Sequence, residues 1–272
     1  MTRVGLVGPG SLGRSIASAL PLDRYQLGPV ASSSFVSARR AVREMRRGWP
    51  AESLTQMADA DCILLFPPEQ ALSDVLQELQ ESINLKGKTV VFAHPTAVVD
   101  PDLGARAHAC RLTPLASFQH PAEDLAGIYF FLEGSPSGVR HARRLLRECK
   151  ARVVAAPLGS AVRVAAAAST AGDAVTALVG FAVELLVDSG LPQKRAIHAL
   201  EPLVAGVLAD YARARGKIRP SLPLATRAPL VRERLEALSA LDDTQAQTYH
   251  RVLRLTQELS GRNCGDDIDA GE

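Results

Sequence analysis

Short apolar runs alternate with helical patterns over the first half of the chain. The helix predicted over residues 69–82 has apolar positions at Ala71, Leu72, Val75, Leu76 and Leu79, close to a period of about 3.6 residues. Strands that alternate with helices of this length are typical of βαβ units and a parallel sheet. The pattern therefore predicts an α/β domain with a doubly wound, mostly parallel sheet. Strands are expected over residues 3–7, 25–31, 60–66, 89–93, 128–132 and 152–156, and helices over residues 11–20, 37–47, 69–82 and 139–149.

The pattern changes after residue 157, and no strand is predicted beyond it. We expect an α/β domain over residues 1–157, an all-helical domain over residues 158–260 and a disordered polar tail over residues 261–272. The helix predicted over residues 161–189 is apolar almost all round, which indicates burial on every side. Three charged residues within it, Arg163, Asp173 and Glu184, argue against a membrane span. Further helices are expected over residues 192–215, 230–241 and 244–259.

Composition narrows the class of protein. The chain has 272 residues and a formal net charge of +2, so no broad surface for nucleic acid is expected. The four cysteines are widely spaced and form no C-x-x-C pair, so neither a clustered metal site nor a disulfide framework is expected. The first residues resemble no secretory signal, and we expect a cytoplasmic protein.

The most informative motif is Gly8-Pro9-Gly10-Ser11-Leu12-Gly13, which directly follows the first predicted strand and opens the first helix. This context is the one that a dinucleotide fingerprint requires. Gly8 allows the tight turn, Gly10 allows the backbone to approach a pyrophosphate, and Gly13 allows the helix to pack closely on the strand. The helix N-terminus then favours the phosphates. The motif predicts a Rossmann-type dinucleotide site rather than an ordinary turn.

The end of the second strand indicates which dinucleotide binds. An NAD site usually has an acidic residue about 20 residues past the fingerprint, but Ser32 and Ser33 stand here instead. Arg39 and Arg40 follow, and guanidinium groups suit a 2′-phosphate. These residues favour NADP (NADPH), the alternative being that the arginines form a solvated helix face.

Two later strand ends are predicted to complete the site, because ligands of open α/β sheets bind at the carboxyl ends of strands. Phe66-Pro67-Pro68 should lie near the cofactor, although this segment also suits a plain strand-to-helix turn. His94 follows the strand over residues 89–93 and is a candidate proton donor, or a structural histidine at the strand end. Thr96, two residues later, is a candidate substrate contact.

These motifs give the chain a family resemblance. It resembles Rossmann-like proteins with a DUF2520 C-terminal domain, related to ketopantoate and pyrroline-5-carboxylate reductases in the 6-phosphogluconate-dehydrogenase-like superfamily. The resemblance covers about residues 3–260 and implies an NADP-dependent oxidoreductase that dimerises through its C-terminal helices. It is carried by the fingerprint and by residues 112–118, 125–134, 181–186 and 231–238.

The chain departs from the family pattern on the substrate side. Thr113 stands where family members have His, and the start of the first long helix lacks the family's Lys, Tyr and His. Asp173 falls about where an Asn is expected. The remaining candidates are Thr113, Ser117 and Asp173 for catalysis and Arg163 for substrate binding, although each hydroxyl also suits a backbone hydrogen bond. We expect the Asp173 carboxyl to be buried in this apolar helix. It should then either form an ion pair with an arginine such as Arg163 or Arg227, or have a raised pKa.

The sequence therefore predicts an NADPH-dependent oxidoreductase that reduces a small carbonyl, imine or 2-keto acid. Because the cofactor carries the hard chemistry, the protein needs mainly orientation and one proton source. The alternative is a non-redox enzyme, such as a cyclase, or a protein that binds a dinucleotide or a hydrophobic ligand without hydride transfer. The expected partners are a small-molecule substrate and a second copy of the chain, with no nucleic acid and no membrane.

Overall fold

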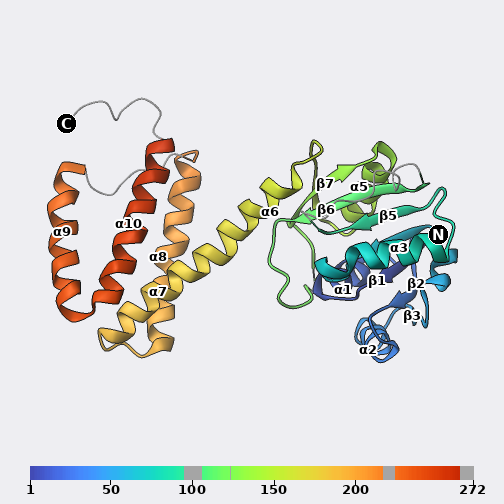
Figure 1. Ribbon diagram of the computed structural model, residues 1–272, viewed down its shortest axis with the longest axis horizontal. Coiled ribbons are helices and arrows are strands. Elements are labelled where there is room, and N and C mark those ends of the chain that lie inside the picture. Colours follow the sequence, from blue (N-terminus) through green and yellow to red (C-terminus); the bar gives the residue numbers. More distant parts are fainter. Residues whose placement is uncertain (95–105, 123, 217–223, 264–272) are drawn as a thin grey trace. The chain divides into compact units, whose positions relative to one another are not determined.

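The computed structural model describes residues 1–94, 106–122, 124–216 and 224–263. The chain divides into two compact units, Met1–Val175 and Thr176–Glu272. The first unit holds all the described strands, and the described part of the second unit is helical (Figure 1). An α/β domain followed by a helical domain is thus confirmed. The predicted boundary at residue 157 follows the last strand, whereas the first compact unit also includes the helix that comes next.

The first unit contains one eight-stranded sheet in the order β3-β2-β1-β4-β5-β6-β7-β8. Its neighbouring strands pair in parallel, except that β6 and β7 are antiparallel. Strand order reverses between β1 and β4, which is the point where doubly wound sheets bind ligands. The strands are β1 (Thr2–Val7), β2 (Tyr25–Ala31), β3 (Trp49–Pro50), β4 (Cys62–Leu65), β5 (Thr89–Phe92), β6 (His108–Pro114), β7 (Tyr129–Gly134) and β8 (Arg152–Ala155).

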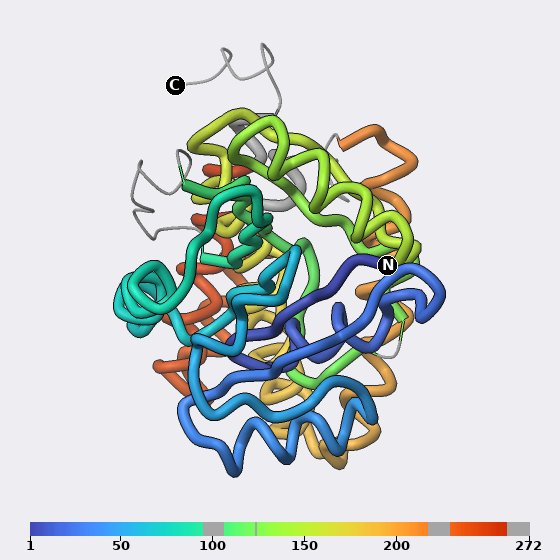
Figure 2. Tube along the Cα trace, turned by 90° about the vertical axis from the view of Figure 1, so that its right-hand side faces the viewer, coloured from blue at the N-terminus to red at the C-terminus, as the bar shows by residue number. Residues whose placement is uncertain are grey.

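Helices cover both faces of the sheet because alternate strand residues point to opposite sides. Leu6 and Leu64 pack in one core cluster with α1, α2 and α5, whereas Val7 and Leu65 pack in another with η1 and α3. In Figure 2, α3 (teal) and α5 (light green) lie on opposite sides of the strands. The elements named here are α1 (Ser11–Ala19), α2 (Phe35–Met45), the 3-10 helices η1 (Leu54–Asp59) and η2 (Glu69–Ala71), α3 (Leu72–Ser82) and α5 (Pro136–Glu148).

Strand β6 is the main element that the hydrophobic pattern did not predict. Its sequence mixes His108, Arg111 and Thr113 with apolar residues, so it has no continuous apolar run. It is nevertheless held between β5 and β7, where it pairs along most of its length. Gly134 allows β7 to approach it, because a Cβ there would lie 2.4 Å from the Ala109 carbonyl oxygen. Tertiary pairing therefore makes this mixed segment a strand.

Glu133, at the end of β7, attaches the next helix to the sheet. Its buried carboxylate accepts hydrogen bonds from the backbone N–H groups of Ser160 (2.9 Å) and Ala161 (3.3 Å), at the start of α6 (Ala161–Ser169). It also forms an ion pair with Arg111 of β6, whose guanidinium lies 5.5 Å from the centre of the Phe92 ring. A carboxylate at a helix N-terminus satisfies backbone groups that would otherwise lack partners.

The long helix predicted over residues 161–189 is present, but the prediction that it is buried on every side is wrong for a single chain. It consists of α6, a π-helical turn η3 (Thr170–Ala174) and α7 (Val175–Asp188), and Ala161 is its one buried residue. By length and composition, Ala161–Asp188 is also the one described helix able to cross a membrane, with a hydropathy of 1.6. The apolar side chains of this helix are therefore left largely exposed in the single chain.

The remaining helices agree in type with the expected ones and differ at their ends. They are α8 (Gln193–Arg213), α9 (Leu224–Leu241) and α10 (Asp243–Asn263). Gln245 of α10 is buried and donates a hydrogen bond to the Asp188 carboxylate of α7 (2.5 Å). Most of the tail expected to be disordered, from residue 264 onward, lies outside the described residues.

Candidate cofactor cleft

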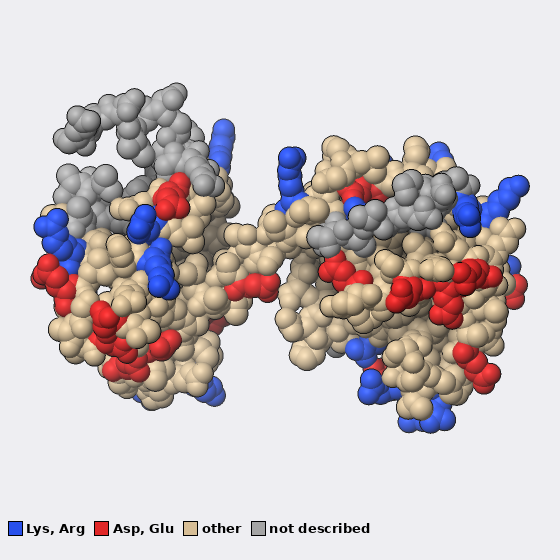
Figure 3. Space-filling view, viewed as in Figure 1, with Lys and Arg blue, Asp and Glu red and all other residues tan. Residues whose placement is uncertain are grey.

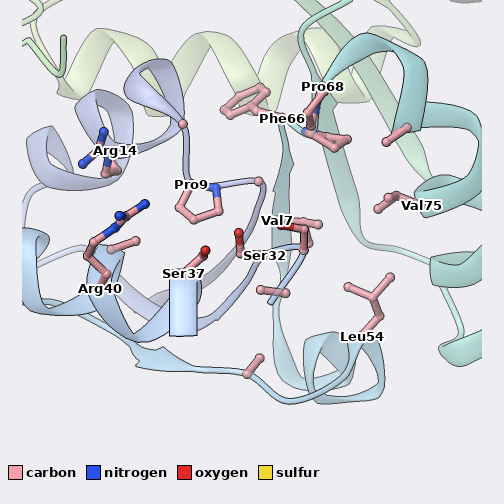
Figure 4. A pocket seen from close by; sticks show the side chains of 18 of the residues that line it. Val7, Pro9, Arg14, Ser32, Ser37, Arg40, Leu54, Phe66, Pro68 and Val75 are labelled. Carbon is pink, nitrogen blue, oxygen red and sulfur yellow. The ribbon is translucent and has the colours of Figure 1, made fainter. Parts of the chain in front are cut away.

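A cleft of about 980 Å³ lies at the carboxyl ends of β1, β2 and β4, where the strand order reverses (Figure 4). Its lining comes from the fingerprint loop, the end of β2, one side of α2 and the segment after β4. Predicted cofactor residues therefore converge on one site. Those that line it are Gly8, Pro9, Gly10, Ser32, Ser33, Arg40, Phe66, Pro67 and Pro68.

The three glycines of the fingerprint have different surroundings. Gly8 has a φ of +76°, and a Cβ there would lie 2.4 Å from the Phe66 carbonyl oxygen, so neither the backbone nor the space suits a side chain. A Cβ on Gly13 would lie 3.0 Å from Leu6 Cδ1 and 3.1 Å from the Gly8 carbonyl oxygen. Gly10 has nothing within 4 Å of its Cβ position, and its φ is −68°. Gly8 and Gly13 thus serve the fold, whereas Gly10 keeps space open in the cleft.

The other fingerprint residues form the start of α1. Gly10 is its N-cap and supplies no capping side chain, so the first N–H groups of the helix suit an anionic ligand. Ser11 donates a hydrogen bond through Oγ to the Gln119 carbonyl oxygen (3.4 Å), and Leu12 packs against the core. Ser11, Leu12 and Gly13 therefore position the loop without lining the cleft.

Helix α2 supplies the polar wall of the cleft. Ser34 caps the helix, because its Oγ accepts a hydrogen bond from the backbone N–H of Ser37 (3.2 Å). This cap directs Ser37 and Arg40 into the cleft, beside Ser32 at the end of β2 (Figure 4). Arg39 is exposed and is not among the lining residues. The structure thus distinguishes the two arginines that the sequence left equivalent.

The opposite side of the cleft combines several apolar side chains with the carboxylates of Glu52 and Glu78. Leu54 of η1 and Val75 of α3 face the polar wall across the gap, with Phe66 and Pro68 beside the fingerprint loop (Figure 4). Apolar side chains opposite hydroxyl and guanidinium groups can take a flat heterocycle on one side and phosphates on the other. The cleft has the chemical division that a dinucleotide requires.

Basic and acidic side chains on the surface lie on different sides of the cleft. On the face shown in Figure 3, basic side chains gather over α2 and acidic ones over α3. The α2 group includes the exposed Arg39, Arg40 and Arg43, and the α3 group includes the exposed Asp74 and Glu78. An anionic end of a ligand is therefore favoured on the α2 side.

His94 lies just past β5, is 9% exposed and contacts the cleft lining through Pro67. Burial lowers its pKa, although a hydrogen bond to the Pro67 backbone acts in the opposite direction. Nε2 of His94 is buried and has no hydrogen-bond partner among the described residues.

The other predicted substrate-side residues are spread over three elements. Thr113 is 5% exposed at the carboxyl end of β6, and Ser117 is exposed in the following loop. Arg163 is exposed on α6. The expectation that Asp173 is buried is wrong: it is exposed, and it accepts a hydrogen bond from Ser169 Oγ (2.8 Å), one helical turn earlier. Thr96 lies outside the described residues.

Sequence reasoning missed four charged residues that line the cleft: Arg14, Glu44, Glu52 and Glu78. Arg14 of α1 and Glu44 of α2 both line it and form an ion pair with each other. They are 30 positions apart, so no local pattern joins them. A signal was present for Arg14, which lies one helical turn after Gly10 and therefore on the same side of α1.

The described residues contain no group of three or more His, Cys, Asp or Glu side chains able to hold a metal ion. Burial raises the pKa of Cys62 and of Cys110 to about 12, so both thiols stay protonated at neutral pH. These cysteines serve as small core side chains.

The fold is a Rossmann-type α/β domain followed by a helical domain, with a cleft at the carboxyl ends of β1, β2 and β4. Residues 128–250 match the model of a domain of unknown function, DUF2520. This match, together with the Rossmann-type fold, agrees with the resemblance that the sequence motifs indicated. No curated protein matches the sequence.

Solved structures support the same fold. A proposed NADP oxidoreductase from Bacteroides fragilis is 20% identical with a TM-score of 0.75, covering 94% of this chain and 98% of that one. A protein from Thermotoga maritima is 19% identical with a TM-score of 0.69, covering 95% and 98%. An imine reductase from Myxococcus stipitatus, in complex with NADP+, is 17% identical with a TM-score of 0.66, covering 98% and 97%. Two of these three neighbours are named as an oxidoreductase and an imine reductase, and at these identities all three show the fold alone.

Proposed function

We propose that the protein is an NADPH-dependent oxidoreductase that reduces a small carbonyl, imine or 2-keto acid. One observation supports this proposal most directly. The fingerprint loop, the hydroxyls of the serines after β2 and Arg40 line a single cleft, at the point where the strand order of the sheet reverses. The structural neighbours include an imine reductase in complex with NADP+, which supports the same cofactor class.

Each wall of the cleft has a role in holding the cofactor. Gly10 leaves space for the pyrophosphate, and the N-terminus of α1 offers its first backbone N–H groups to it. Arg40, Ser32 and Ser33 hold the 2′-phosphate through charge-assisted hydrogen bonds. When bound, NADPH supplies the hydride.

The substrate side falls to residues at the ends of β5 and β6. His94 follows β5 and contacts Pro67, a lining residue of the cleft. Its imidazole is the group that orients the substrate or an ordered water, and Thr113 adds a hydroxyl at the carboxyl end of the neighbouring strand β6. The final proton comes from water or from protonated His94 at low pH.

A second candidate function follows from the start of α6. Ala161, Val162, Val164 and Ala165 stand beside Arg163 there, so the helix offers one charged group and no Lys, Tyr or His. In this second candidate function, the protein binds NADPH without transferring its hydride, or it catalyses a non-redox reaction.

Binding and turnover separate the two candidates. Titration of the protein with NADPH and NADH, followed by cofactor fluorescence, is expected to show binding with a preference for NADPH. NADPH oxidation against a panel of ketones, cyclic imines and 2-keto acids is then expected to show turnover. Binding without turnover on any member of the panel favours the second candidate, and absence of binding refutes the proposal.

We also propose a soluble, cytoplasmic homodimer that pairs through the C-terminal helices. Leu203, Val207 and Leu208 of α8 are 61%, 61% and 69% exposed in the single chain, which leaves an apolar surface uncovered. Helix α7, which lies in the same unit from Thr176 onward, is apolar and has no buried residue. Sedimentation at micromolar concentration is expected to give twice the chain mass of 29.0 kDa, and a monomer refutes the pairing.

A further inference from the structure

The polar wall of the cleft contains an acidic residue where an anion is proposed to bind. Arg14, Arg40 and Glu44 all line this wall, and Glu44 follows Arg40 by one turn of α2 (Figure 4 labels the two arginines). The Glu44 carboxylate pairs with the Arg14 guanidinium. The three side chains therefore bring a formal charge of +1, instead of the +2 that the arginines alone would bring.

The two arginines differ in what occupies them. Arg40 has no ion pair or hydrogen bond among the described residues, so it is free to bind an anion. Arg14 is engaged by Glu44, and this carboxylate is 46% exposed rather than enclosed. A partly exposed ion pair holds its partners weakly, so a competing anion can redirect Arg14.

We infer that Glu44 is a specificity-determining residue that limits the preference of the cleft for NADPH over NADH. The inference rests on the proposed function, because it assumes that the dinucleotide binds with its adenosine ribose beside α2. A 2′-phosphate carries about two negative charges at neutral pH, whereas the 2′-hydroxyl of NADH carries none. Glu44 opposes only the phosphate, and it also withholds Arg14 from it.

The test compares Glu44→Gln with the wild type and with Glu78→Gln. The first variant removes the charge from the α2 wall, and the control removes the same charge from the α3 side of the cleft. Dissociation constants for NADPH and NADH are measured by cofactor fluorescence at low ionic strength. Glu44→Gln is expected to tighten NADPH binding about three- to fivefold, the range that one exposed charge contributes, and to leave NADH within about a factor of two.

Three further readouts make the outcome decisive. The gain for NADPH is expected to shrink in high salt, because screening weakens exposed charges. Glu78→Gln is expected to leave the ratio of the two affinities unchanged. Glu44→Ala, which cannot keep the hydrogen bond to Arg14, is expected to tighten NADPH as well, and thermal unfolding checks that both Glu44 variants are folded.

The failures are distinguishable. Equal changes for NADPH and NADH, or weaker NADPH binding in both Glu44 variants, overturn the inference while the proposed cofactor site stands. The inference is also overturned if Glu78→Gln raises the preference for NADPH over NADH as much as Glu44→Gln does. Loss of any negative charge at the cleft would then have the same effect. A wild-type protein that binds neither nucleotide refutes the proposed function, and the inference with it.

Discussion

Replacing Gly10 with valine tests the cofactor site without disturbing the fold. A Cβ at Gly10 meets no atom within 4 Å, and the φ of −68° is one that any residue adopts. Glycine is a better N-cap than valine, so Gly10→Val is expected to cost about 1 kcal/mol or less of unfolding free energy. The valine methyl groups would instead occupy space that the pyrophosphate needs, and measurable NADPH binding should disappear.

Gly13→Val is the matched control within the same motif. A Cβ at Gly13 lies 3.0 Å from Leu6 Cδ1 and 3.1 Å from the Gly8 carbonyl oxygen, and the backbone oxygen cannot move aside cheaply. Overpacking of this kind costs about 1–3 kcal/mol. For a domain of this size the melting temperature should fall by about 3–10 °C, with or without cofactor.

The assay follows thermal unfolding of the wild type and both variants with and without NADPH. The wild type is expected to gain melting temperature with cofactor, since a ligand that binds only the native state stabilises it. Gly10→Val should melt within about 3 °C of the wild type and gain nothing from NADPH. Gly13→Val should melt lower even before cofactor is added.

One result refutes the reasoning. If Gly10→Val binds NADPH as the wild type does, the fingerprint loop is not the pyrophosphate site, and the oxidoreductase proposal loses its main support. A large loss of stability in Gly10→Val would contradict the open surroundings of this glycine.

Three further predictions follow from the site. Arg40→Ala should weaken NADPH about tenfold more than NADH, since it removes a charge-assisted bond, whereas exposed Arg39→Ala should leave the ratio unchanged in the same titration. Glu133→Ala should cost about 3 kcal/mol in urea unfolding, because Arg111 and the start of α6 lose a buried carboxylate, and a loss near zero would show that water replaces it. Burial lowers the pKa of the His94 imidazole in the folded protein. As the pH falls below about 6.5, this imidazole therefore becomes protonated in the unfolded chain before it does so in the folded protein. Stability should therefore fall with pH, and His94→Gln should reduce the slope of melting temperature between about pH 7 and 5.

Local patterns predicted the parts of the site that are close together in the sequence. The fingerprint spans six consecutive residues, Gly8 to Gly13, and its place after a strand already identifies the turn, the helix start and the expected ligand. Ser32 and Arg40 could be recognised because they follow the next predicted strand. Periodicity also gave the long helix over residues 161–188, which is a property of consecutive residues.

Only the tertiary structure decided which residues meet across the chain. Arg14 and Glu44 pair over 30 positions, and Arg111 and Glu133 pair over 22, so no spacing rule connects them. The same packing selects Arg40 over its neighbour Arg39, because only one side of α2 faces the cleft. Exposure of the helix over residues 161–188 was also beyond the sequence: periodicity indicates which residues are apolar, whereas the neighbouring elements determine whether they are covered.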